Sequence, residues 1–270
     1  MPFHQVSFGD FEVIAVQAQP NRVIQAANLF PTVDLAEFEA EFVRNPTYFG
    51  TNSSELRFTQ TICLVRKGAE LILIDTGVPF DHEDAMLLGG MREAGITPDL
   101  VTLVVLTHRD MDHIGGTMRD GKPAFPKARY IISKCEYEGY KVDTDRSHFP
   151  AYIAPLEEAG VLDVVADDAE ITPGLRLVLT PGHRPGATSV LVDNRLIALA
   201  DVWHCPAQVS HPEWKIGFDT DADLAIKTRT NVIEEAEEKS WLVAVPHTPE
   251  FGLGRVGRKD GARVWLPAIA

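Results

Sequence analysis

The chain of 270 residues has little cysteine, a deficit of positive charge and no long apolar run. Its three cysteines, Cys63, Cys135 and Cys205, are widely spaced and include no CxxC pair, so neither a disulfide framework nor a thiolate zinc site is indicated. The formal net charge of -14 disfavours binding to nucleic acid or to anionic membranes. No apolar run is long enough to span a bilayer, and no signal peptide is evident, so we expect a cytoplasmic protein.

Short β-branched and apolar runs alternate with amphipathic segments along the whole chain. The expected strands are 11–16, 61–65, 71–74, 101–106, 130–132, 175–179, 189–192, 196–199 and 242–245. The expected helices are 35–44, 82–94 and 221–239, the last with Asp221 among its possible N-cap residues. Segments 17–59 and 134–170 are rich in Pro, Asn and aromatics and are predicted to be loops. With no repeat or linker in sight, residues 1–270 are expected to form a single domain of mixed α/β layers.

Polar side chains directly follow several of the predicted strands. Asp75 directly follows LILI, His183 follows LVLTPG, Asp201 ends LIALAD and His247 ends LVAVPH. Strand ends meet at the edge of a sheet, so these residues can lie close together in space although they are far apart in sequence. Histidine nitrogens and carboxylate oxygens without thiolates suit zinc, manganese or iron.

The stretch LTHRDMDHIGG, residues 106–116, concentrates four such groups after one strand. His108 and Asp110 face the same way if the chain stays extended, and Asp112 and His113 follow where IGG indicates a turn or a helix start. One tight loop of this kind can offer ligands to two adjacent ions.

Taken in order, these motifs resemble the metallo-β-lactamase fold superfamily over about residues 60 to 255. The segments ADVWHCPAQVSHPEWKIGFDTD and PHTPEFGLGRV are further similar to the branch that holds methyl parathion hydrolase and lactonase-like hydrolases. The resemblance implies an αββα sandwich of two mixed sheets flanked by helices, with a binuclear metal site at one edge and a small-molecule substrate. A homodimer is compatible with it.

The ligand set that the resemblance implies is carried over by position. His108, Asp110 and His183 would bind the first metal, Asp112, His113 and His247 would bind the second, and Asp201 would bridge the two. Asp75 would support the site through hydrogen bonds. His204, three residues after Asp201, is a candidate substrate contact, and a structural histidine is an equally good interpretation of it.

The departure from the family pattern is Asp110, where the hydrolases have histidine. A carboxylate is shorter and harder than imidazole, adds negative charge and shifts the preference of the first site from zinc toward manganese or iron. Two divalent ions, zinc first, would supply a metal-bound hydroxide at neutral pH, with Asp112 and Asp201 as catalytic residues.

Three functions are compatible with these residues. The first is a binuclear metal-dependent hydrolase of a small ester, lactone or phosphoester. The second is an iron-dependent redox enzyme, because diiron relatives of the fold also place an acidic residue at the position of Asp110; they add a flavin-binding domain that these 270 residues do not include. The third is a metal-poor binding protein without turnover.

Overall fold

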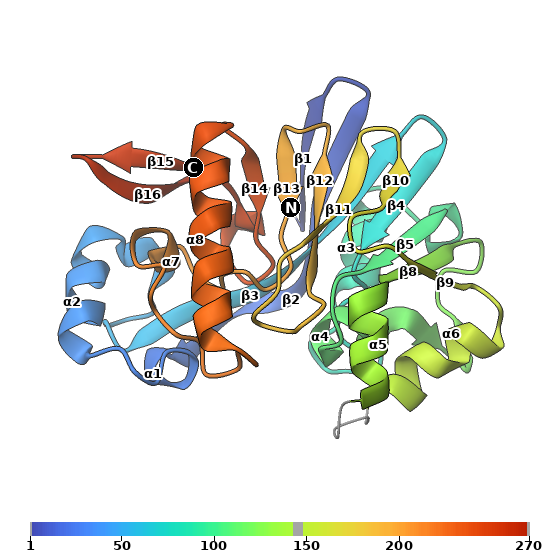
Figure 1. The fold of residues 1–270 in the computed structure, drawn as a ribbon, viewed down its shortest axis with the longest axis horizontal. Coiled ribbons are helices and arrows are strands. Elements are labelled where there is room, and N and C mark those ends of the chain that lie inside the picture. The colour runs from blue at the N-terminus through green and yellow to red at the C-terminus, as the bar shows by residue number, and fades with distance from the viewer. Residues whose placement is uncertain (1, 143–147, 269–270) are drawn as a thin grey trace.

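The computed structural model describes residues 2–142 and 148–268, in which two seven-stranded mixed sheets pack against each other (Figure 1). The strands of the first sheet, in spatial order, are β1 Phe3–Phe8, β2 Phe11–Gln25, β3 Glu55–Lys67, β4 Glu70–Ile74, β5 Leu103–Leu106, β8 Arg129–Ser133 and β9 Leu162–Val165. Those of the second sheet are β10 Glu170–Thr172, β11 Leu175–Leu179, β12 Thr188–Val192, β13 Leu196–Ala198, β14 Leu242–Ala244, β15 Leu253–Lys259 and β16 Ala262–Pro267. Strands β6 Met118–Arg119 and β7 Lys122–Pro123 form a separate small hairpin.

Helices cover the outer face of each sheet. They are α1 Ala26–Leu29, α2 Leu35–Arg44, α3 Leu87–Glu93, α4 Met111–Ile114, α5 Lys134–Val142, α6 Ala154–Glu158, α7 Ala207–Ser210 and α8 Ala222–Glu238. Single 3-10 turns lie at Pro46–Tyr48, Pro98–Leu100, Gly115–Thr117 and Glu250–Gly252, and a π-helical turn at Phe149–Ile153. In Figure 1, α8 stands on one side of the strands, and α5 and α6 stand on the other.

Strand alternation explains why the layers stack in this order. Ile72 in β4 and Val190 in β12 point into the core between the sheets, whereas their neighbours point outward. Leu73 packs into the cluster that contains α3, and Leu191 into the cluster that contains α8. Each central strand is therefore buried on both faces, which requires helices on both outer surfaces. The expected αββα sandwich is confirmed.

The prediction of loops over 17–59 and 134–170 was wrong for most of both segments. Strand β2 continues to Gln25 and β3 begins at Glu55, and the pairing between them shifts register around Gln19 and Arg22, next to Pro20. These bulges accommodate residues that ordinarily indicate a loop. The second segment holds α5, α6 and β9, while its residues 143–147 lie outside the described residues.

Three other boundaries differ from or refine the sequence analysis. The C-terminal hairpin of β15 and β16 was missed because Gly254 and Gly257 lie within β15; a Cβ on Gly254 would lie 2.4 Å from the Trp265 ring. Helix α3 starts at Leu87, not at residue 82. Asp221 does cap α8, its side chain accepting a hydrogen bond from the N–H of Leu224 at 3.0 Å. In the described part of the chain, no helix has both the length and the apolar character needed to cross a bilayer.

Candidate metal centre

The loops that follow β4, β5, β13 and β14, together with the β11–β12 loop, meet at one edge of the sandwich. Strands β4 and β5 run parallel, as do β13 and β14, so the carboxyl ends of each pair open on the same side. All seven predicted ligands and His204 meet there in overlapping groups with metal-binding spacing. We call these residues the histidine–aspartate cluster: His108, Asp110, Asp112, His113, His183, Asp201, His204 and His247.

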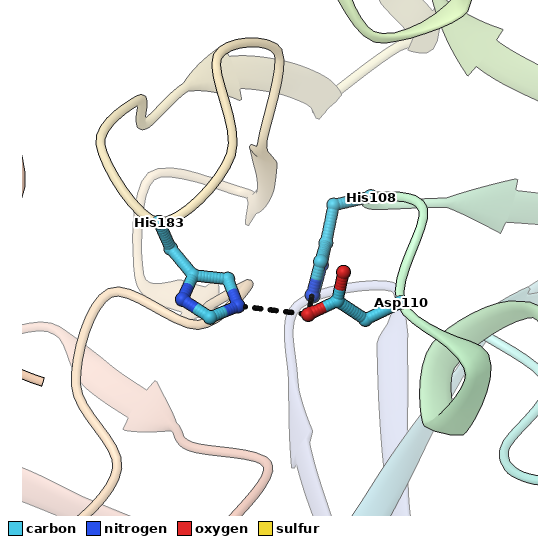
Figure 2. Close-up of side chains that lie close together, drawn as sticks. All are labelled: His108, Asp110 and His183. Carbon is cyan, nitrogen blue, oxygen red and sulfur yellow. Dashed lines mark hydrogen bonds and ion pairs between the residues drawn. The ribbon is translucent and has the colours of Figure 1, made fainter. Parts of the chain in front are cut away.

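The first group consists of His108, Asp110 and His183 (Figure 2). Asp110 Oδ2 lies 3.0 Å from His183 Nε2 and 3.8 Å from His108 Nε2. His108 follows β5, whereas His183 comes from the loop between β11 and β12, and the three side chains point toward one another. Such donor spacing suits one ion with three ligands from this group.

The second group consists of Asp112, His113 and His247. Asp112 Oδ2 lies 3.7 Å from His113 Nε2 and 3.6 Å from His247 Nε2. Asp112 and His113 both belong to α4, a single helical turn directly after Asp110. The start of α4 at Met111, three residues before IGG, therefore separates Asp110 of the first group from the ligands of the second.

Asp201 lies between the two groups. Its Oδ1 is 3.3 Å from His113 Nε2, and its Oδ2 is 3.6 Å from His183 Nε2 and 3.2 Å from His247 Nε2. A single carboxylate thus reaches histidines of both groups, as a bridging ligand must.

Hydrogen bonds to the other ring nitrogen fix the orientation of four histidines. The Nδ1 partners are Thr107 Oγ1 for His108 at 3.0 Å, Asp75 Oδ2 for His113 at 2.7 Å, Asp219 Oδ1 for His183 at 3.1 Å and the Thr59 carbonyl for His247 at 3.1 Å. Because Nδ1 is engaged, Nε2 of each ring is directed at the common centre. Asp75 therefore holds His113 through a hydrogen bond, the supporting role expected for it.

Buried polar atoms without hydrogen-bond partners mark the centre of the cluster. Within the described residues, His108 Nε2, His113 Nε2 and Asp201 Oδ1 are buried and form no hydrogen bond. Burial holds the pKa of His108 well below its usual range, which leaves this imidazole neutral. Buried polar groups are normally satisfied, and neutral imidazole with carboxylate is a donor set that divalent zinc, manganese or iron accepts. The residues present fit a pair of divalent ions.

Carboxylates on both sides of His183 set its charge in the metal-free cluster. Burial lowers the pKa of His183, but hydrogen bonds to Asp110 and Asp219 outweigh burial and raise it to about 9. The pKa of Asp110 is lowered far below its usual range: burial would raise it, but the hydrogen bond from His183 and the charge of Arg184 outweigh burial. In the metal-free protein His183 therefore carries a proton and Asp110 a negative charge, and a metal ion bound between them would displace that proton.

His204 lies deeper than a residue at the rim of a pocket. Its side chain is 3% exposed, its Nε2 lies 3.0 Å from Asp201 Oδ2, and its ring stacks on His247 with centroids 5.1 Å apart. Asp110 and Asp112 are more open, with side chains 21% and 33% exposed. The accessible side of the cluster is therefore the side of these two aspartates.

Two charged residues that contact the cluster, Arg184 and Asp219, were not predicted from the sequence. Arg184 binds Asp110 with two hydrogen bonds, from Nε to Oδ1 at 2.7 Å and from Nη2 to Oδ2 at 2.6 Å. The side chain of Asp219 is fully buried and joins His183 to Arg229, whose Nη2 lies 3.5 Å from its Oδ2. The pairing of Arg184 with Asp110 had a signal in the sequence, because Arg184 directly follows the predicted ligand His183 and Asp110 departs from the family pattern. No spacing in the sequence indicated Asp219.

The fold and the cluster define a class of αββα proteins with a group of potential metal-binding side chains at the sheet edge. Residues 57–196, more than half of the chain, match the Metallo-beta-lactamase superfamily, and the chain belongs to this family.

Among characterised relatives, the chain is similar to two N-acyl homoserine lactonases. It is 28% identical over 143 residues to one from Bacillus cereus, an alignment that covers 45% of this chain and 53% of that protein. It is 26% identical over 178 residues to one from a Bacillus species, covering 64% and 66%. The chain thus spans about half to two thirds of the length of these relatives.

Two solved structures have a similar fold over nearly the whole chain. AidC, a dizinc quorum-quenching lactonase in complex with an N-hexanoyl-L-homoserine product, is 25% identical with a TM-score of 0.85, over 99% of this chain and 98% of that one. AbOPH, a hydrolase of the β-lactamase superfamily, is 23% identical with a TM-score of 0.88, over 100% and 98%. The latter likeness concerns the fold alone.

Proposed function

We propose that this protein is a metal-dependent hydrolase that opens a lactone or ester bond of a small molecule with two divalent ions, of which zinc is the preferred one. The observation that carries the proposal is the convergence of histidine Nε2 atoms on Asp201, with Nδ1 of four rings held by other groups. The similarity to N-acyl homoserine lactonases supports a lactone as the substrate.

In the proposal, His108, Asp110 and His183 hold the first ion, Asp112, His113 and His247 hold the second, and Asp201 joins them. A pair of divalent ions bound by these residues would supply an acidified water and Lewis-acid polarisation of a substrate carbonyl. Every further task falls to side chains of this chain.

In this proposal, Asp112 orients the attacking water and passes its proton to the leaving alkoxide. Its carboxylate is the more exposed of the two at the open side, and Gln60 Nε2 contacts it at 3.5 Å. A partly exposed carboxylate beside two imidazoles can accept a proton and release it to solvent. Asp201, buried and held by histidines on several sides, is instead suited to a fixed position.

His204 contacts the substrate in this proposal, next to Asp201. Because the ring is buried, the contact requires the carbonyl end of the substrate to reach into the cluster. A compact ring or a slender acyl group satisfies this requirement better than a bulky one.

The test is a substrate panel with the zinc-loaded wild-type protein. Proton release would be followed with N-acyl homoserine lactones of several acyl lengths, simple γ-lactones, aryl esters and phosphotriesters. We expect turnover of lactones above that of the other classes, and its loss in Asp201→Asn but not in Asp193→Asn, which changes an aspartate in the β12–β13 turn. A fully loaded protein without turnover of any lactone or ester would exclude the proposed function.

A further inference from the structure

Arg184 and Asp110 form an ion pair inside the first metal group that the hydrolase pattern does not explain. We propose that Arg184 is a positioning residue of the first metal site: it orients the Asp110 carboxylate as a ligand and cancels its charge, so that the pair replaces one neutral histidine. This inference rests on the binuclear site of the proposed function. It explains why an aspartate is tolerated at this position.

The geometry of the pair is that of a fixed fork. Both oxygens of Asp110 accept from Arg184, at 2.7 and 2.6 Å, while Oδ2 also faces His183 at 3.0 Å. The guanidinium fork occupies one side of the carboxylate and leaves the other side of Oδ2 directed at the imidazoles. Arg184 thus selects which oxygen of Asp110 faces the metal position.

The guanidinium of Arg184 is itself held by backbone carbonyls on the side away from Asp110. Its Nη1 donates to the carbonyls of His183 at 2.8 Å and Phe218 at 2.7 Å and lies 3.3 Å from Thr220 Oγ1. Its side chain is 20% exposed. An arginine with this many fixed acceptors differs from the mobile surface ion pairs whose contribution is near zero.

A capping role for Asp110 is the simplest competing interpretation. Asp110 is the N-cap residue of α4, a position where aspartate is common because its side chain accepts from the helix N–H groups. Within the described residues, however, its side chain makes no capping hydrogen bond, and the carboxylate binds Arg184 and His183 instead. The aspartate therefore serves the cluster and not the helix.

The two loops that carry the pair are held together by a second buried contact. Glu136, at the start of α5, accepts from the N–H and Nε of Arg109 at 2.9 Å each and from the N–H of Gly186 at 3.1 Å. A Cβ on Gly186 would lie 2.1 Å from the backbone nitrogen of Glu136, so only glycine permits this approach. Asp110 and Arg184 thus meet at a separation that their flanking residues determine.

Because Arg184 and Asp110 neutralise each other, we expect the removal of either one to weaken the first metal site. A guanidinium this close to a divalent ion is tolerated only while Asp110 neutralises it, and removal of one partner leaves the other as an uncompensated charge. Restoring histidine with Asp110→His alone therefore harms the first site, because it frees Arg184 next to the metal. Removing both charges together repairs the site.

The experiment measures zinc binding in four proteins: wild type, Arg184→Met, Asp110→His and the double variant. Elemental analysis after dialysis gives stoichiometry, competition with a chromophoric chelator gives the two affinities, and cobalt spectra report ligand geometry. We expect each single variant to bind one of the two ions about 10–100-fold more weakly, with the other ion unaffected. The double variant recovers two ions at near wild-type affinity, and Arg184→Lys, which keeps the charge without the fork, is intermediate.

The matched control is Arg195→Met, which removes an exposed arginine paired with Asp193 outside the cluster and leaves both affinities unchanged. Thermal unfolding of the metal-free forms separates loss of fold from loss of binding. Wild-type affinities in Arg184→Met or in Asp110→His, or a double variant no better than the singles, would overturn the inference while the proposed hydrolase stands. A two-zinc wild type that hydrolyses nothing would instead remove the proposed function and leave the role of Arg184 intact.

Discussion

Two clusters in the described part of the chain bury carboxylates beside histidines, and they differ in whether protein groups pair their buried polar atoms. The first is the Glu41 cluster, consisting of Glu41, Arg44, Asn45 and His211. Glu41 on α2 accepts from Asn45 at 2.5 Å and Arg44 at 3.3 Å, and His211 Nε2 lies 3.5 Å from it. His211 Nδ1 in turn contacts Glu213 at 3.4 Å. Each carboxylate oxygen of Glu41 has a partner, so the Glu41 cluster is complete as protein alone.

The histidine–aspartate cluster also combines buried carboxylates with imidazoles, but its polar atoms are not all paired. Its donors converge on shared points at 3.0–3.8 Å, and several buried atoms have no hydrogen bond within the described residues. A histidine in contact with a carboxylate is therefore insufficient evidence for a metal site. The informative feature is that Nδ1 of four histidines is hydrogen-bonded to other groups while their Nε2 atoms face one another.

The largest expected effect breaks the histidine–aspartate cluster at its centre. Asp201→Asn removes the charge that both groups share, so both ions bind weakly and turnover falls by about a thousandfold, equivalent to about 4 kcal/mol of transition-state stabilisation. Steady-state kinetics and elemental analysis check this, with Asp193→Asn as the control. Two tightly bound zinc ions in Asp201→Asn would contradict the bridging position.

A smaller effect is expected one contact further out. Asp219→Asn weakens the hydrogen bond that orients His183, and we expect affinity for the first ion to fall about 10–100-fold while the second ion is retained. Chelator competition measures both affinities. Asp223→Asn, an exposed acidic change on α8, is the control; an equal loss of both ions would show a general effect on the fold.

The smallest effect concerns the Glu41 cluster and involves stability, not metal. Glu41 raises the pKa of His211 above its ordinary value of 6.5, whereas the pKa of Glu41 is lowered from 4.5 because hydrogen bonds from His211 and Asn45 outweigh burial. The pair therefore stabilises the fold most between pH 4.5 and pH 6.5. The contribution of His211 is lost as the pH rises through its raised pKa, and the contribution of Glu41 is lost as the pH falls through its lowered pKa.

His211→Gln should accordingly lower the free energy of unfolding by about 1–2 kcal/mol at pH 6 and by less at pH 9. Denaturant titrations at the two pH values test this, and zinc stoichiometry should be unchanged in the same samples. A loss that grows with pH would mean that protonated His211 does not stabilise the fold.

The sequence was informative where periodicity and residue chemistry coincide. Buried central strands such as β4 and β12 are short apolar runs, and the groups that follow them could be placed at one edge because parallel strands end together. The bulged ends of β2 and β3 could not be predicted, since register depends on pairing between segments about 35 residues apart. Strand β15 was not predicted because it contains Gly254, and the contact that requires a glycine there is with the Trp265 ring in the next strand.

At the site, ligand types were accessible from the sequence and their supporting contacts were not. Asp110 was identified as unusual, but no protein side chain was predicted to pair with its charge. Its compensation by Arg184 depends on how the β11–β12 loop approaches the loop after β5, and that approach depends on Gly186 and Glu136. Tertiary contacts of this kind leave no periodic signal in a single sequence.

The most direct test of the contrast between the two clusters is elemental analysis of the wild-type protein purified without added metal. The account predicts two divalent ions per chain, zinc or manganese, removed together with activity by a chelator and restored by zinc. Less than one metal ion per chain, or stoichiometric iron accompanied by oxygen or peroxide chemistry, would contradict it.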